Sequence, residues 1–174
     1  MPASSSSDRT LSLARNVLNA LLVLNHICLA AFALVLVGSF VAEPMFRAPL
    51  ESVNEDDPGV LIAALRIVMV LGLTAVPLTH ILLSRLLAMV DTVHSGDPFV
   101  SENARRLTTI AWSLLGLQFL DLAFAAVSLG LVSDVRQLEW TFGFTGWIAV
   151  LMLFVLARVF HHGARMREEL EGTV

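Results

Sequence analysis

Long apolar runs separated by short polar segments dominate this chain. The runs cover residues 17–42, 60–90, 107–132 and 142–160. A helix that rises 1.5 Å per residue needs about 20 mainly apolar residues to cross the hydrocarbon core of a bilayer. Each run meets that length. The pattern therefore predicts an all-α integral membrane protein, built as a bundle of four transmembrane helices.

Helical spacing continues beyond Leu83, near which the strongly apolar part of the second run ends, and beyond the fourth run. In the second run it persists through Arg85 to Val90, and after the fourth run it persists from Phe160 to Leu170. In the latter stretch Arg165 and Glu169 are spaced i, i+4, which stabilises a solvated helix. We expect both helices to extend into the cytoplasm. Residues 1–14 are predicted to be disordered, and residues 15–174 to form a single transmembrane domain.

The basic residues, all of them arginine, are distributed unevenly. Eight precede the first run, flank the connection between the second and third runs, or flank or follow the fourth: Arg9, Arg15, Arg85, Arg105, Arg106, Arg158, Arg165 and Arg167. Cytoplasmic segments of membrane proteins carry an excess of Arg and Lys. The distribution therefore predicts that both termini lie in the cytoplasm, an N-in/C-in topology, with an acidic external loop over residues 43–59.

Composition and motifs argue against several classes of function. The net charge of −4 does not favour direct nucleic-acid binding, which needs a basic surface. Cys28 is the only cysteine, so neither a disulfide nor a cysteine metal site is expected. The sequence has no nucleophile elbow, Walker loop, zincin motif or dinucleotide fingerprint. We therefore expect no enzyme activity and no bound metal.

Asp121 lies near the middle of the third apolar run. A carboxylate at that depth costs about 2.5–3.5 kcal/mol on insertion scales, so such groups face the interior of a bundle. Arg66, about two turns into the second run, could pair with Asp121 if the two helices are antiparallel neighbours. The alternatives are a buried ion pair, a site for a ligand, an ion or a proton, and a protonated acid without a role.

Other polar residues share these apolar runs. We predict one buried polar site from Asp121, Arg66, Gln118, His26, Asn25 and His80. Hydrogen bonds between helices are the simplest role for Asn25 and His26. His26 and His80 lie on different helices and could in principle ligate a haem. The regular histidine spacing of membrane cytochromes is absent, so we expect no haem and no other cofactor.

Two stretches carry a family resemblance. They are GDPFVSEN at residues 96–103, followed by Arg106 and Leu107, and LARVFHHGARMREELEGTV at residues 156–174. With the layout of the apolar runs, they resemble a bacterial four-helix membrane protein family catalogued as domain of unknown function 2975. The resemblance covers nearly the whole chain beyond the first dozen residues. One departure is the pair His161 and His162, where an Arg or Lys and an acidic residue are expected.

The resemblance implies a multi-pass protein of the bacterial inner (cytoplasmic) membrane. Members of the family are often encoded beside a small helix-turn-helix regulator, which implies such a protein as a partner. One hypothesis is therefore a membrane-anchored regulatory protein. It would tether this transcription regulator or sense a signal on its behalf. Its predicted partner-binding residues are Phe99, Asn103, Arg106, Arg158, Arg165, Arg167 and Glu168. Phe99 could instead plug the cytoplasmic end of the bundle.

The second hypothesis is a protein that handles a small molecule or an ion, either as a sensor or as a minimal transporter. It would use Asp121 and the neighbouring polar residues. Because four helices make a narrow bundle, transport would require a homo-oligomer. A regulator gene beside the gene for this chain favours the first hypothesis, whereas a water-filled cavity that reaches Asp121 favours the second.

Overall fold

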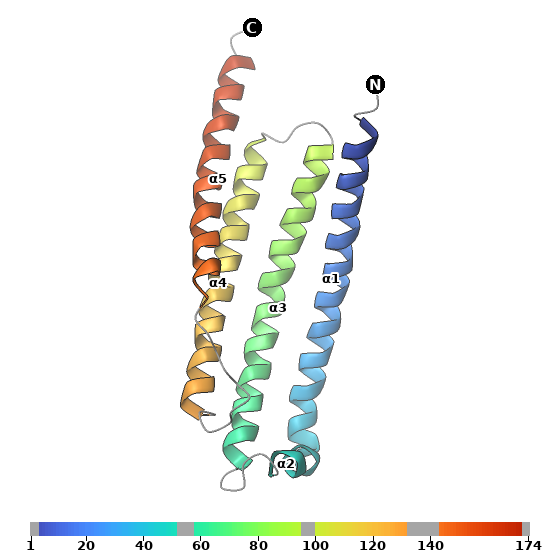
Figure 1. Cartoon of the computed structure of the whole chain (residues 1–174), viewed down its shortest axis with the longest axis vertical. Helices are drawn as coiled ribbons and strands as arrows, with labels where there is room; N and C mark the ends of the chain where they lie inside the picture. Colours follow the sequence, from blue (N-terminus) through green and yellow to red (C-terminus); the bar gives the residue numbers. More distant parts are fainter. Residues whose placement is uncertain (1–3, 52–57, 95–99, 132–142, 172–174) are drawn as a thin grey trace.

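The computed structural model describes residues 4–51, 58–94, 100–131 and 143–171. Helices account for these residues almost completely, and no strand occurs among them. The helices are α1 (Ser4–Val41), α2 (Glu43–Glu51), α3 (Pro58–His94), α4 (Ser101–Leu131) and α5 (Phe144–Glu171) (Figure 1). Four of them, α1, α3, α4 and α5, are long and apolar enough to cross a membrane. The predicted fold class is therefore confirmed.

The helix boundaries differ from the expected ones at two places. Residues 4–14, predicted to be disordered, belong to α1, which begins at Ser4. A helix already formed by the apolar run extends at little cost, because nucleation is the expensive step. The acidic loop contains the short helix α2, which the apolar pattern did not predict. The extensions beyond the second and fourth apolar runs are helical, since α3 reaches His94 and α5 reaches Glu171.

The long helices stand side by side in an open row, in the order α1, α3, α4, α5 (Figure 1). Each packs against its neighbour in the row, and α2 contacts α1 and α3. Within the described ranges, α1 contacts neither α4 nor α5, and α3 does not contact α5. Only 6% of the most apolar window of α1 is buried inside the chain. The row therefore has no enclosed interior, which the prediction of a buried polar site had assumed.

Glycines lie where neighbouring long helices approach most closely. Gly72 of α3 faces the Phe32 ring of α1, and Gly116 of α4 faces Leu78 of α3. Gly146 of α5 lies against the side chain of Gln118 on α4. Helices in membranes associate through close packing rather than through the hydrophobic effect, so small residues are favoured at their contacts.

Gly72→Val should therefore lower stability by about 1–2 kcal/mol, the usual cost of overpacking a tight contact. A β-carbon at Gly72 would lie 2.9 Å from Cζ of Phe32, so either the Phe32 ring or the two helices must shift. Gly130→Val on α4 is the matched control, because nothing lies within 4 Å of a β-carbon there. Thermal unfolding of the two variants in the same detergent provides the comparison. Equal unfolding temperatures would contradict the proposed role of Gly72.

Candidate functional site

The start of α1, the end of α3, the start of α4 and the end of α5 lie at the same end of the row (Figure 1). We call it the charged end, because Arg9, Arg85, Arg105 and Arg158 are exposed on the helix segments that reach it. Arg15 of α1 and Asp91 of α3 are also paired there, with Nε 3.8 Å from Oδ1. Both of these side chains are more than half exposed, so the pair contributes little to stability.

Asn103 and Arg106 join α4 to α3 at the charged end. Asn103 is only 1% exposed, and its Nδ2 donates to Oγ1 of Thr92 at 2.8 Å. Its Oδ1 accepts a hydrogen bond from Nη1 of Arg106 at 3.0 Å. The same Nη1 donates to the carbonyl oxygen of Ala88 at 2.9 Å. We therefore assign these two residues to helix packing, which corrects their prediction as partner-binding residues.

Arg106 has one further contact on α4. Its Nε is buried without a hydrogen bond and lies 3.8 Å from Oε1 of Glu102. The guanidinium is thus held by the carboxylate of Glu102 on one side and by Asn103 and the α3 backbone on the other. Such a fixed and largely buried arginine cannot turn toward a partner without breaking these contacts.

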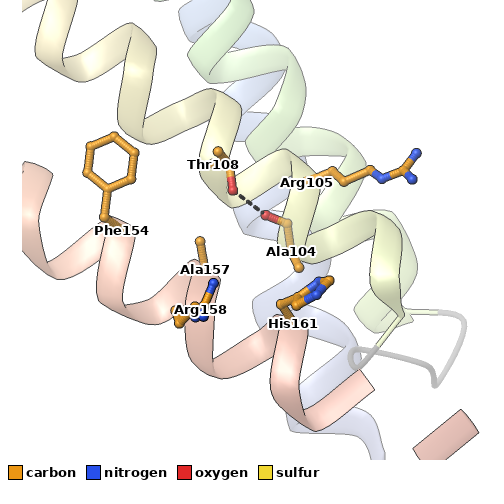
Figure 2. A pocket seen from close by; sticks show the side chains of 7 residues that line it. All are labelled: Ala104, Arg105, Thr108, Phe154, Ala157, Arg158 and His161. Atoms are coloured by element: carbon orange, nitrogen blue, oxygen red, sulfur yellow. Dashed lines mark hydrogen bonds between the residues drawn. The ribbon is translucent and has the colours of Figure 1, made fainter. Parts of the chain in front are cut away.

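A groove between α4 and α5 opens at the charged end, with a volume of about 350 Å³ (Figure 2). Its lining consists of Ala104, Arg105, Thr108, Phe154, Ala157, Arg158 and His161. Ala104 and Ala157 are buried and small, so they leave space between the two helices. Phe154 closes the groove toward the apolar part of the row by an edge-to-face contact with Trp112, at 5.4 Å between ring centroids. We refer to this feature as the basic groove.

Two arginines, a histidine and a threonine form the polar part of the described groove lining. Figure 2 shows His161 projecting from α5 toward α4, whereas the Arg105 side chain extends away from α5 in this view. The Thr108 hydroxyl donates to the carbonyl oxygen of Ala104 at 3.0 Å, so its proton is already engaged in a hydrogen bond within α4. Among the lining residues that the structure describes, none carries a carboxylate. Arginine and histidine therefore give this groove the donors and the charge to bind a carboxylate or a phosphate.

The remaining predicted partner-binding residues, apart from Phe99, belong to α5. Arg158 lines the basic groove, while Arg165 and Arg167 are exposed farther along the helix. Glu168 belongs to α5, but its side chain lies outside the described part of the structure, as does Phe99 entirely. Arg105 and His161 were not among the individually predicted partner-binding residues, although both lie in the two stretches that carry or adjoin the family resemblance. The spacing of Arg158 and His161, three residues apart on a helix, places both on one face and could have revealed His161.

Arg66 does not pair with Asp121. Its Nη2 donates to the carbonyl oxygen of Ser39 at 2.6 Å and to Oε2 of Glu43 at 3.1 Å. Its guanidinium carbon lies 4.0 Å from the centroid of the Phe40 ring. Arg66 thus joins the end of α1 and the start of α2 to α3. Because the last carbonyls of a helix have no partner within it, an arginine placed there satisfies one of them.

Asp121 and Gln118 are not part of a common polar site either. Asp121 is exposed on α4, which corrects the expectation that it faces an interior, because the open row covers only part of each helix. Gln118 is half-buried and packs against Gly146 of α5. The six residues predicted as one polar site therefore do not form one.

Asn25, His26 and His80 are the part of that prediction that the structure brings together. Nδ2 of Asn25 donates to the carbonyl oxygen of Val76 at 3.1 Å, which ties α1 to α3 beside Pro77. The rings of His26 and His80 meet edge to face, with centroids 5.2 Å apart. Rings at this distance touch directly, so no layer remains between them for a haem macrocycle.

Comparison with known proteins shows that the chain matches one protein family. The family described as "Protein of unknown function (DUF2975)" matches residues 63–174. This match extends from α3 through α4 and α5, and it includes the basic groove. No curated protein and no solved structure matches the chain.

Proposed function

We infer that this chain, which belongs to the family of unknown function DUF2975, is a non-enzymatic regulatory protein of the bacterial inner membrane. In this proposal it holds a small helix-turn-helix transcription regulator at the charged end. The observation that carries the proposal is the basic groove, in which Arg105, Arg158 and His161 lie together and no carboxylate occurs among the described lining residues. The family resemblance supplies the kind of partner.

A protein partner fits this surface better than a lipid headgroup does. From His161, α5 continues to Glu171, which is about 15 Å of helix at 1.5 Å per residue. Arg165, Arg167 and Glu169 are exposed along this extension. A phosphate at the membrane surface could reach the groove, but it would leave the extension without a contact. A partner with an acidic segment could use both, the groove for affinity and the mixed charges of the extension for selectivity.

The proposed orientation places the charged end in the cytoplasm. Eight of the eleven arginines lie in segments at or leading to this end, which agrees with the excess of basic residues in cytoplasmic segments. A cytoplasmic regulator could then reach the basic groove. DNA contacts would belong to the regulator, because this chain has a net charge of −4.

The alternative function, handling of an ion or a small molecule around Asp121, has less support. Arg66 is engaged by Ser39 and Glu43, and Gln118 packs on α5. Neither residue therefore gathers with Asp121 around a common cavity.

The proposed function is tested by charge reversal in the groove. We expect Arg105→Glu with Arg158→Glu to reduce recovery of the helix-turn-helix regulator at least tenfold when the protein is purified from native membranes after crosslinking. The matched control is Arg9→Glu with Arg85→Glu, which reverses two exposed arginines on α1 and α3, outside the groove. Mass spectrometry of the purified material measures the regulator and the bound phospholipid together.

The outcomes separate the alternatives. Loss of the regulator in the groove variant alone supports the proposal. Equal loss in both double variants would indicate bulk charge rather than a groove. Loss of anionic phospholipid with the regulator retained would make the groove a lipid site. If wild-type protein recovers no regulator from cells that express it, the proposal is wrong.

A further inference from the structure

We propose that a second site, between α1 and α3, binds a lipid-soluble molecule that carries a phenolic hydroxyl on an apolar body. The site is the pocket beside His26 and His80. It shares no residue with the basic groove and does not depend on the regulator proposal.

The pocket has the dimensions of a small-molecule site. Its volume is about 390 Å³, within the range of about 300–1,000 Å³ that such sites occupy. Asn25, His26 and Leu29 of α1 line one side, and Leu73, Val76, Pro77, His80 and Ile81 of α3 line the other. A mainly apolar lining with a few placed polar groups is typical of sites for apolar ligands that are held by one polar group.

His26 presents a hydrogen-bond acceptor in this pocket. Its Nδ1 lies 2.7 Å from the carbonyl oxygen of Leu22, and a carbonyl oxygen can only accept. Nδ1 therefore carries the proton. In the neutral ring Nε2 then has a free lone pair, because the bond made by one nitrogen sets the state of the other. A hydroxyl group is the matching donor.

His80 supplies the second polar contact. Its ring lies edge to face against His26, with an interplanar angle of 84°. Within the described segments it makes no hydrogen bond to another residue. His80 is exposed, yet it lies well inside the apolar span Gly59–Val93 of α3. In hydrocarbon an imidazole without a hydrogen bond is costly, so a ligand that bonds both histidines would relieve this cost.

The surrounding residues hold the pocket in place. Asn25 is 8% exposed and fixes α1 to the carbonyl of Val76, directly before Pro77. The pocket opens on the side of the row, between two helices able to span a membrane, and not at the charged end. A ligand would therefore enter laterally from the bilayer. A metal ion fits less well, because the described residues contain no group of three or more His, Cys, Asp or Glu that could hold one.

The test compares 4-hexylphenol with its methyl ether, 4-hexylanisole, which has a similar shape but no hydroxyl proton. Protein with ¹⁵N-labelled histidine in lipid nanodiscs is titrated with each compound, and the imidazole NMR signals are followed. We expect saturable changes at His26 and His80 with the phenol, and affinity for the ether at least tenfold weaker. The lost hydrogen bond in an apolar pocket accounts for that ratio.

Two variants and one control localise the site. His26→Phe and His80→Phe keep a ring but remove its nitrogens, and each should weaken phenol binding at least tenfold. His162→Phe, at an exposed position of α5, should leave binding unchanged. Equal affinity for the phenol and the ether in wild-type protein would overturn the proposal, since the pocket would then be an apolar cleft filled by lipid. This comparison needs no variant, so it stands even if a substitution prevents folding.

Discussion

Arg66→Met is expected to lower the free energy of unfolding by about 2–3 kcal/mol. The Arg66 side chain is 25% exposed and contacts both Glu43 and the final turn of α1. Breaking a buried pair by removal of one partner costs about 3–5 kcal/mol, and partial exposure reduces that value here. Methionine keeps most of the apolar stem and isolates the loss of the guanidinium. Thermal unfolding in detergent, with helix content as the readout, measures the change.

Arg47→Met is the matched control for this prediction. Arg47 also contacts Glu43, at 3.6 Å, but its side chain is 48% exposed. Its loss should therefore cost little, as for most exposed pairs. Arg66→Lys should fall between the two, because an ammonium keeps the charge but cannot match the planar fork that reaches Ser39 and Glu43 together. Similar losses in Arg66→Met and Arg47→Met would contradict the assigned role of Arg66.

The partner of Arg66 illustrates what the sequence could and could not predict. Hydropathy predicted the long helices, because a bilayer requires an apolar run of fixed length. Which acid faces Arg66 depends on the order of helices in the row, and hydropathy carries no information about that order. Asp121 and Glu43 were both available in the sequence. The structure favours Glu43 because Arg66 lies near the end of α1, whereas Asp121 is on α4.

The short helix α2 was missed for a related reason. It spans nine residues, Glu43–Glu51, too few to produce an apolar run. Pro44 lies in the first turn of α2, where a proline is tolerated because that N–H has no helical partner. Glu43 at the start adds a favourable charge near the helix N-terminus. Both features are local, and a search for helix-start patterns would have found them.

The candidate site was predicted only in part. A match to a family pattern singled out Asn103, Arg106 and Arg158 together, although only Arg158 lines the groove. A sequence pattern does not distinguish a residue that packs helices from one that binds a partner, because both roles demand a specific side chain. Burial makes the distinction, since Asn103 is 1% exposed. The histidine pair required the pairing of α1 with α3, which the chain order alone did not establish.

Asn103→Leu is expected to lower the free energy of unfolding by about 3 kcal/mol. Leucine has the same branched arrangement of side-chain heavy atoms but removes the acceptor for Nη1 of Arg106 and the donor to Thr92. Hydrogen bonds to charged groups contribute about 1.5–3 kcal/mol, and a buried group left without a partner costs about 1–3 kcal/mol more. Arg106 would keep its contacts with Ala88 and Glu102, which limits the total loss.

The same variant separates helix packing from partner binding. Asn16→Leu on α1 is the control, because Asn16 is exposed and the chemical change is identical. Unfolding temperatures in detergent should fall for Asn103→Leu and remain near the wild-type value for Asn16→Leu. If Asn103 bound a partner directly, Asn103→Leu would abolish recovery of the regulator and leave the unfolding temperature unchanged. That result would return Asn103 to the partner surface and would require α3 and α4 to be held together by other contacts.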